Sequence, residues 1–159
     1  GIDLVPAIAR HLPPNAHLIW TGGVATPNGS FFLVKKQLEQ LKLRNVHFVG
    51  AQTSDYAHYL QAADGFVLTS REEAFGMVNV EAAYLGKPIV TFDSGGVREF
   101  LTEGMGIMVK NGDVEALTEA MRNVMVGGFE FDPALAKARA QEFGSDRLVQ
   151  EWHRIMAGF

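Results

Sequence analysis

Two glutamates, Glu73 and Glu81, stand eight residues apart around a glycine turn at Gly76. An apolar run ends just before them at residue 69, and a second apolar segment begins at Met77. This order predicts a strand, a turn and the N-terminus of a helix. The first N–H groups of a helix lack partners within it and carry partial positive charge, so such a turn can hold an anion. The expected ligand is a phosphate.

Glu81 is the one charged residue between Met77 and Lys87, and apolar side chains surround it, so we expect this helix to be largely buried. A buried carboxylate is costly unless it is paired or faces a polar cleft. Two interpretations remain open at this point. Glu81 accepts hydrogen bonds from adjacent hydroxyls such as those of a ribose, or it forms an internal ion pair with Lys87 or Arg98.

The residues just before the helix also have two interpretations each. Glu73 lies beside Arg71 and Glu72, as a solvated loop glutamate often does, or it contacts a ligand. Phe75 plugs the core below the turn, or its backbone faces the ligand. Gly76 is less ambiguous, because a residue without Cβ lets the backbone adopt unusual angles and approach a ligand closely.

Alternating strand and helix patterns position this segment. Apolar runs rich in β-formers predict five strands, at residues 17–20, 46–49, 66–69, 89–92 and 106–109. Helices are predicted at residues 3–12, 31–43, 54–63, 77–86, 97–102, 113–126, 133–143 and 146–156. This alternation predicts an α/β fold with a Rossmann-like parallel sheet flanked by helices. Ligands bind such sheets beyond the carboxyl ends of the strands, in loops expected at residues 21–23, 50–54, 70–76 and 93–96.

Composition narrows the class of protein. A chain of 159 residues, 47% hydrophobic and 20% charged, is expected to form one domain over residues 1–159, with an α/β body at 1–126 and bracing helices at 129–159. The net charge of -4 argues against a nucleic-acid partner. No cysteine is present, which fits a cytoplasmic protein. The five histidines show no ligand spacing, so no metal site is predicted.

Several motifs, in order along nearly the whole chain, resemble one family. Residues 73–82, E-A-F-G-M-V-N-V-E-A, followed by G-K-P-I-V at 86–90, resemble the E-x7-E signature of retaining GT-B glycosyltransferases of family GT4. The strings N-V-H-F-V-G at 45–50, A-A-D-G-F at 62–66 and G-G-V-R-E at 95–99 resemble the family's N-x-x-F-x-G, A-D-x-x-V and G-G-x-x-E motifs. A match of several motifs in register is far more specific than one E-x7-E alone.

The resemblance implies the C-terminal, donor-binding domain of a two-domain enzyme. Such an enzyme transfers a sugar, with retention and without a metal, from a UDP-, GDP- or ADP-sugar to an acceptor hydroxyl. The nucleotide diphosphate-sugar is a donor substrate, and no cofactor is expected. Glu81 would bind the ribose hydroxyls, and Glu73 would lie near the transferred sugar as a positioning residue.

The remaining site residues are implied mainly through their backbone. Groups around Ala74, Phe75, Gly76 and Met77 would contact the sugar and the diphosphate. Further from the turn, the implied contacts are Gly50 and Gln52, which would flank the base, and Gly22, which would match a glycine turn after the family's second strand.

Two departures from the family pattern concern the start of the chain. Gly1 matches the glycine that follows the family's diphosphate-binding arginine and lysine. We therefore expect the cationic clamp, the first strand and the N-terminal acceptor domain to be missing, with an exposed sheet edge and little transferase activity. Membrane association of the full-length protein is left open.

Two other classes of function remain as alternatives. One is a non-catalytic module that binds nucleotide-sugars. The other is a different GT-B enzyme such as a sugar-nucleotide epimerase. A phosphorylase would need a lysine for pyridoxal phosphate in a suitable context, which the sequence does not show.

Overall fold

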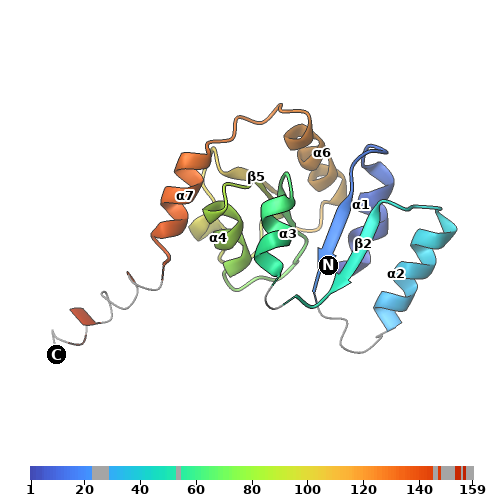
Figure 1. The fold of residues 1–159 in the computed structure, drawn as a ribbon, viewed down its shortest axis with the longest axis horizontal. Helices are drawn as coiled ribbons and strands as arrows, with labels where there is room; N and C mark the ends of the chain where they lie inside the picture. The colour runs from blue at the N-terminus through green and yellow to red at the C-terminus, as the bar shows by residue number, and fades with distance from the viewer. Residues whose placement is uncertain (23–28, 53–54, 145–146, 148–152, 155, 157–159) are drawn as a thin grey trace.

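The computed structural model describes every residue except 23–28, 53–54, 145–146, 148–152, 155 and 157–159. Helices and strands alternate along the chain (Figure 1). In order, the elements are η1 (Ile2–Leu4), α1 (Val5–His11), β1 (Leu18–Thr21), α2 (Gly29–Gln40), β2 (Val46–Gly50), α3 (Tyr56–Ala62), β3 (Phe66–Leu68), α4 (Met77–Tyr84), β4 (Ile89–Phe92), α5 (Val97–Phe100), β5 (Gly106–Val109), α6 (Val114–Met125) and α7 (Pro133–Gln141). The predicted α/β class and the five strands are confirmed.

The strands are parallel, but their hydrogen bonds form two groups rather than the one expected sheet. β1 pairs with β2, placing Leu18 opposite Val46, and β4 lies between β3 and β5. Within the described residues no ladder joins β1 to β3. In the Rossmann order 3-2-1-4-5-6, another strand stands between the second and the fourth. Gly22 follows β1, so β1 matches the family's second strand, and β3, two strands later along the chain, matches the fourth. The break between β1 and β3 therefore falls where the Rossmann order places its first strand.

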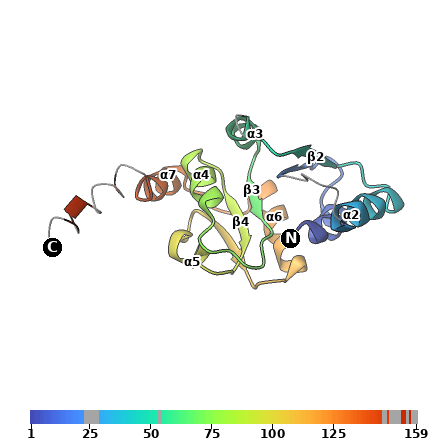
Figure 2. The same ribbon diagram turned by 90° about the horizontal axis from the view of Figure 1, so that it is seen from below.

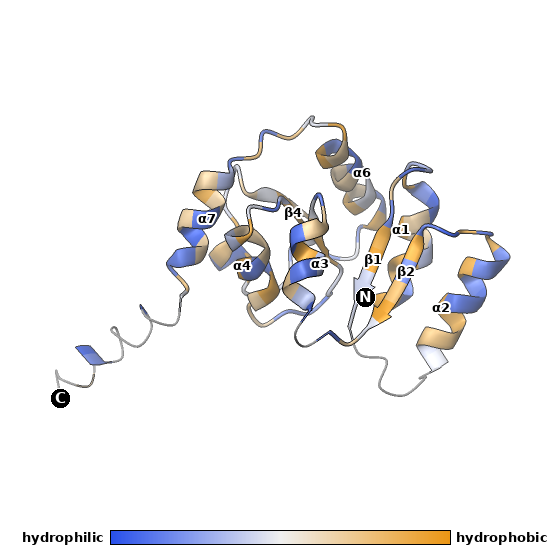
Figure 3. Cartoon of the chain, viewed as in Figure 1, coloured by the Kyte–Doolittle hydropathy of each residue, from blue (hydrophilic) through white to orange (hydrophobic). Residues whose placement is uncertain are grey.

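A shared apolar core holds the two groups of strands together. Leu18 of β1 and Val90 and Phe92 of β4 belong to one cluster with residues of α1, α2 and α6, including Ile8 and Leu117. Apolar residues dominate β1 and β2, whereas α2 and α3 carry hydrophilic residues among apolar ones (Figure 3). Burial of this surface stabilises the arrangement although main-chain pairing is interrupted.

A second cluster places α4 against the sheet. It joins Ile89 of β4 to Val80 and Ala83 of α4 and to Phe100 of α5. All four residues of β4 are buried: Ile89 belongs to this cluster, whereas Val90 and Phe92 belong to the first one. β4 is therefore the central strand of its group and anchors the helix that follows the predicted turn.

Helix α7 packs beside α4 (Figure 2). Ala136 and Ala140 are buried against the second cluster, and Phe143, just beyond the helix, contacts Phe75 and Phe100. The predicted helix at 146–156 falls mostly outside the described residues. The division between a body at 1–126 and bracing helices at 129–159 stays a prediction.

Candidate functional site

A left-handed glycine starts α4, as the sequence predicts. Gly76 has φ 78°, and its carbonyl accepts a hydrogen bond of 2.8 Å from the Asn79 N–H. No side chain caps this helix. Because the Asn79 N–H is engaged, the N–H groups of the first turn that remain open to an external acceptor are those of Met77 and Val78. The helix dipole favours an anion there.

The space behind Gly76 is filled. A Cβ on Gly76 would come within 2.7 Å of Asn79 Nδ2 and 3.2 Å of Glu73 Cγ. Asn79 is completely buried, and neither atom of its amide finds a hydrogen-bond partner among the described residues. Both the positive φ and this crowding require glycine at the turn.

The loop after β4 supports the backbone of Glu73, a role that the sequence reasoning missed. The Gly96 N–H donates to the carbonyls of Glu73 and Ala74, at 3.3 and 3.1 Å. A Cβ on Gly95 or Gly96 would overlap those same carbonyl oxygens. The Gly-Gly pair following a strand was the available signal, because such close backbone approach excludes every side chain.

The loop between β3 and α4, which carries Glu73, is also tied to the N-terminus and to the loop after β5. Arg71 forms a two-pronged ion pair with Asp3, at 2.6 and 3.0 Å, which lowers the pKa of Asp3. Asn111 Nδ2 donates to the Arg71 carbonyl at 2.6 Å, and the Ser94 hydroxyl donates to the Ser70 carbonyl at 3.3 Å. Residues 70–76 are thus supported from several sides, which favours a preformed site.

The expectation that α4 is largely buried is only half right. Its buried residues are Asn79, Val80, Ala82 and Ala83. Met77 is 53% and Tyr84 51% exposed, and Glu81 is also exposed. These three residues lie at helical spacing on one face. That face opens to solvent because α4 covers the sheet with its opposite side.

The structure contradicts the ion-pair interpretation of Glu81. Lys87 Nζ donates to the Gln61 carbonyl at 2.7 Å, and the Arg98 guanidinium pairs with Asp93. Protein packed around the Glu81 carboxyl raises its pKa by desolvation, although the side chain reaches the surface. An accessible carboxylate with neither of those cations beside it suits a neutral hydrogen-bond donor such as a hydroxyl.

The side chain and the backbone of Phe75 have different surroundings. Its ring contacts those of Phe143 and Phe100, with centroids 5.1 and 6.4 Å away, so the side chain belongs to the core. Only its backbone lies in the turn, between exposed Ala74 and buried Gly76. Any ligand contact of Phe75 is therefore made by the main chain.

Gly22, the predicted match to the family's glycine turn, lies beside Gly50, which was predicted to flank the base, at the ends of β1 and β2. The Gly22 N–H donates to the Gly50 carbonyl at 3.0 Å, and Gly50 has φ 77°. Gln52 turns back, so that its Nε2 donates to the Val49 carbonyl. The Nε2 group of Gln52 is thus engaged with the main chain of β2. The predicted loop residues 23, 53 and 54 lie outside the described residues.

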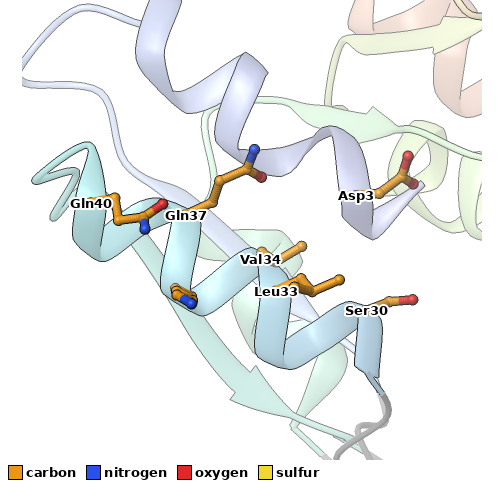
Figure 4. Close-up of a pocket in the computed structure, with 7 residues that line it drawn as sticks. Asp3, Ser30, Leu33, Val34, Gln37 and Gln40 are labelled. Carbon is orange, nitrogen blue, oxygen red and sulfur yellow. The ribbon is translucent and has the colours of Figure 1, made fainter.

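A hollow of about 440 Å³ opens between η1 and α2. Figure 4 shows its lining residues, with Asp3 on η1 and Ser30, Leu33, Val34, Gln37 and Gln40 on α2. It contains none of the predicted site residues. Asp3 already holds Arg71, so the hollow borders the supports of the site rather than forming the site itself.

The described residues contain no group of three or more His, Asp or Glu side chains placed to hold a metal ion. His17 and His47, far apart in sequence, do meet across β1 and β2, with Nδ1 and Nε2 2.9 Å apart.

Among the described helices, none has the length and apolar character needed to cross a bilayer.

The sequence profile of the family described as "Glycosyl transferases group 1" matches residues 1–141. The chain belongs to this family. Glycogen synthase of Mycobacterium tuberculosis is 36% identical over 112 residues, covering 69% of this chain and 26% of that protein. Poly(glycerol-phosphate) alpha-glucosyltransferase of Bacillus subtilis is 34% identical over 126 residues, 77% of this chain and 19% of that protein.

Solved structures of GT-B glycosyltransferases share the fold. The Anabaena protein HepE, in complex with UDP and glucose, matches with a TM-score of 0.90 and 24% identity. The match covers 100% of this chain and 45% of HepE. The chain therefore has the fold of part of these longer proteins, and spans less than half of each protein named here.

Proposed function

We propose that the chain is the donor-binding domain of a retaining glycosyltransferase that uses a nucleotide diphosphate-sugar. The observation that carries this proposal is the uncapped start of α4 at Gly76, with Glu73 on one side and an accessible Glu81 on the other. The open N–H groups suit the diphosphate, and the Glu81 carboxylate suits the two ribose hydroxyls. HepE, of the same fold, was solved with UDP-glucose, which supports this class of ligand.

The mechanism follows from where charge develops. As the bond between sugar and diphosphate breaks, negative charge grows on the leaving phosphate. Fixed N–H groups at Gly76 and Met77 stabilise the transition state, in which this charge develops, more than they stabilise the bound donor before reaction. They therefore lower the activation barrier. They need no reorganisation, because residues 70–76 are held by Gly96, Asn111 and the Asp3–Arg71 ion pair.

Glu73 acts as a positioning residue in this proposal. Its backbone is fixed by the Gly96 N–H, and its Cγ lies close behind Gly76, so the side chain starts at the edge of the phosphate turn. From there the carboxylate orients the sugar hydroxyls for attack by the acceptor. It forms no covalent bond and takes no proton. The proton of the acceptor hydroxyl passes to an oxygen of the leaving diphosphate as the new glycosidic bond forms and the bond to the diphosphate breaks.

Turnover is proposed to require the longer protein. The cationic diphosphate clamp and the acceptor-binding domain expected in this family are contributed by other parts of it. The 159-residue chain therefore binds donor weakly and transfers little sugar. Efficient transfer by this chain alone to any acceptor, followed by product chromatography, would contradict the proposal.

Isothermal titration with UDP, GDP and ADP, and with the corresponding glucose and mannose conjugates, tests the binding function. We expect one base to be preferred and the preference to survive in the sugar conjugates. Glu81→Ala should weaken the nucleotide itself, whereas Glu73→Ala should weaken the sugar conjugate more than the nucleotide. A wild-type chain that binds none of these ligands at millimolar concentration would overturn the proposed function.

A further inference from the structure

Buried polar atoms without partners are rare in folded proteins, and each asks for an explanation. The described residues contain three such side chains, Asn45, Tyr56 and Asn79. Asn79 lies behind the phosphate turn. Tyr56, the first residue of α3, has its hydroxyl buried without a hydrogen-bond partner. It stands outside every motif that the sequence singled out.

The ring of Tyr56 packs against the cluster that contains Leu60 of α3 and Val80 and Ala83 of α4. Tyr56 therefore packs against a cluster to which α3 and α4, the helix that carries Glu81, both contribute residues. Burial, and then the charge of Glu81, raise the pKa of the Tyr56 hydroxyl to about 12. The hydroxyl consequently keeps its proton at any physiological pH and is available as a donor.

Competing partners for Glu81 are engaged elsewhere. Lys87 is bound to the Gln61 carbonyl, and Arg98 is bound to Asp93. Tyr56, whose hydroxyl feels the charge of Glu81, still has a hydrogen to donate. Glu81 is a carboxylate with several acceptor positions.

We propose that Tyr56 is a positioning residue for Glu81, whose hydroxyl donates a hydrogen bond to the Glu81 carboxylate when a nucleotide is bound. The inference rests on the proposed function and adds to it the element that orients the ribose contact. A carboxylate has about four acceptor positions, so one bond from Tyr56 leaves room for both ribose hydroxyls.

This hydrogen bond would do two things for ribose recognition. It restricts the Glu81 side chain to one orientation before the ribose arrives, which lowers the entropy cost of binding. It also favours the ionised carboxylate, because a donor to the charged form opposes the desolvation that now raises the Glu81 pKa. Both effects should change the affinity for the ribose hydroxyls of the nucleotide.

The test compares UDP, GDP and ADP with their 2′-deoxy counterparts, by titration calorimetry, on wild type and on Tyr56→Phe. Loss of a hydrogen bond to a charged group should weaken the preferred nucleotide about tenfold. Preference for the ribo form over the 2′-deoxy form should fall with it. Tyr59→Phe, on the same helix, removes a hydroxyl of the same kind and should bind as wild type does.

A double-mutant cycle separates positioning from a structural role. In a Glu81→Gln background, Tyr56→Phe should cost little further affinity, because the two residues act through one interaction. Additive losses in the cycle, or an unchanged ribose preference in Tyr56→Phe, would overturn the inference and leave the proposed function standing. If wild type binds no nucleoside diphosphate, the proposed function fails and takes the inference with it.

Thermal melting completes the test. Phe fills the same volume without an unpaired hydroxyl, so Tyr56→Phe should melt no lower than wild type. A clear drop in its melting temperature would show that the hydroxyl already has a structural partner, and would contradict the inference.

Discussion

Two neighbouring helices, α4 and α7, begin in opposite ways. They have 8 and 9 residues and pack side by side. α7 starts at Asp132, whose carboxylate accepts hydrogen bonds of 2.9 Å from the Ala134 and Leu135 N–H groups. α4 starts at Gly76 and has no side-chain cap. A helix that caps itself gains stability, whereas one that leaves its first turn open keeps those donors for a ligand.

The open start is also the less favourable one for folding. α4 needs a left-handed glycine and buries the unpartnered amide of Asn79 beside it, whereas α7 begins with Pro133 directly after its cap, which suits a helix start. Local features that lower stability in this way are expected where function competes with stability. The comparison therefore separates residues kept for binding from residues kept for the fold.

Giving α4 the cap of α7 should have the largest effect. In Gly76→Asp the new Cβ meets the Asn79 amide, and a non-glycine residue must adopt φ 78°, which together cost about 1–3 kcal/mol of unfolding free energy. The new carboxylate also repels a phosphate at the turn. We expect nucleotide binding to vanish in calorimetry, with a lower urea midpoint. If the folded variant still bound nucleotide, the turn at Gly76 would not be the phosphate-binding site.

Glu81→Gln should come next. It removes the charged acceptor for the ribose and should weaken nucleotide binding by at least tenfold. Because the pKa of Glu81 is raised in the fold, ionising it opposes folding at neutral pH, so the variant should be slightly more stable than wild type at pH 7. That advantage should disappear as the pH falls below the usual glutamate range, where both states are protonated. Urea unfolding at several pH values measures it.

Removing the cap of α7 should affect stability alone. Asp132→Ala leaves two N–H groups without their acceptor and should cost about 1 kcal/mol in chemical unfolding. Nucleotide affinity, measured on the folded variant, should not change. A loss of affinity larger than twofold would mean that α7 sets the position of α4 and that the two helix starts are not independent.

Asn79→Leu should have the smallest effect, and in the opposite direction. It replaces a completely buried amide with an apolar side chain of similar branching, and should raise the unfolding free energy by up to about 1 kcal/mol. A lower thermal midpoint would show that the amide makes a compensating hydrogen bond, and would remove one of the costs assigned to the α4 start.

Local sequence signals predicted the local parts of this molecule well. β4 and β5 match the expected ranges 89–92 and 106–109, because short apolar runs between helical segments have few alternatives. The turn at Gly76 and the start of α4 at Met77 were also found, since glycine before an apolar helical run is a signal within a few residues. Their assigned roles in binding remain proposals.

The missed features all depend on residues distant in sequence. The interruption between β1 and β3 is a matter of pairing between strands, which local pattern does not encode. Arg71 finds Asp3 across 68 positions, and Gly96 meets Glu73 through the fold. The partner choice of Lys87 likewise became visible only when the Gln61 carbonyl was placed beside it.

In the described structure β1 and β3 each pair on one side only. A strand margin of this kind is adhesive, because its free N–H and C=O groups accept any extended chain of suitable length. The isolated domain should therefore self-associate increasingly as its concentration rises, through strand pairing between copies. Shielding those margins, rather than enlarging the apolar core, is the practical route to a soluble preparation.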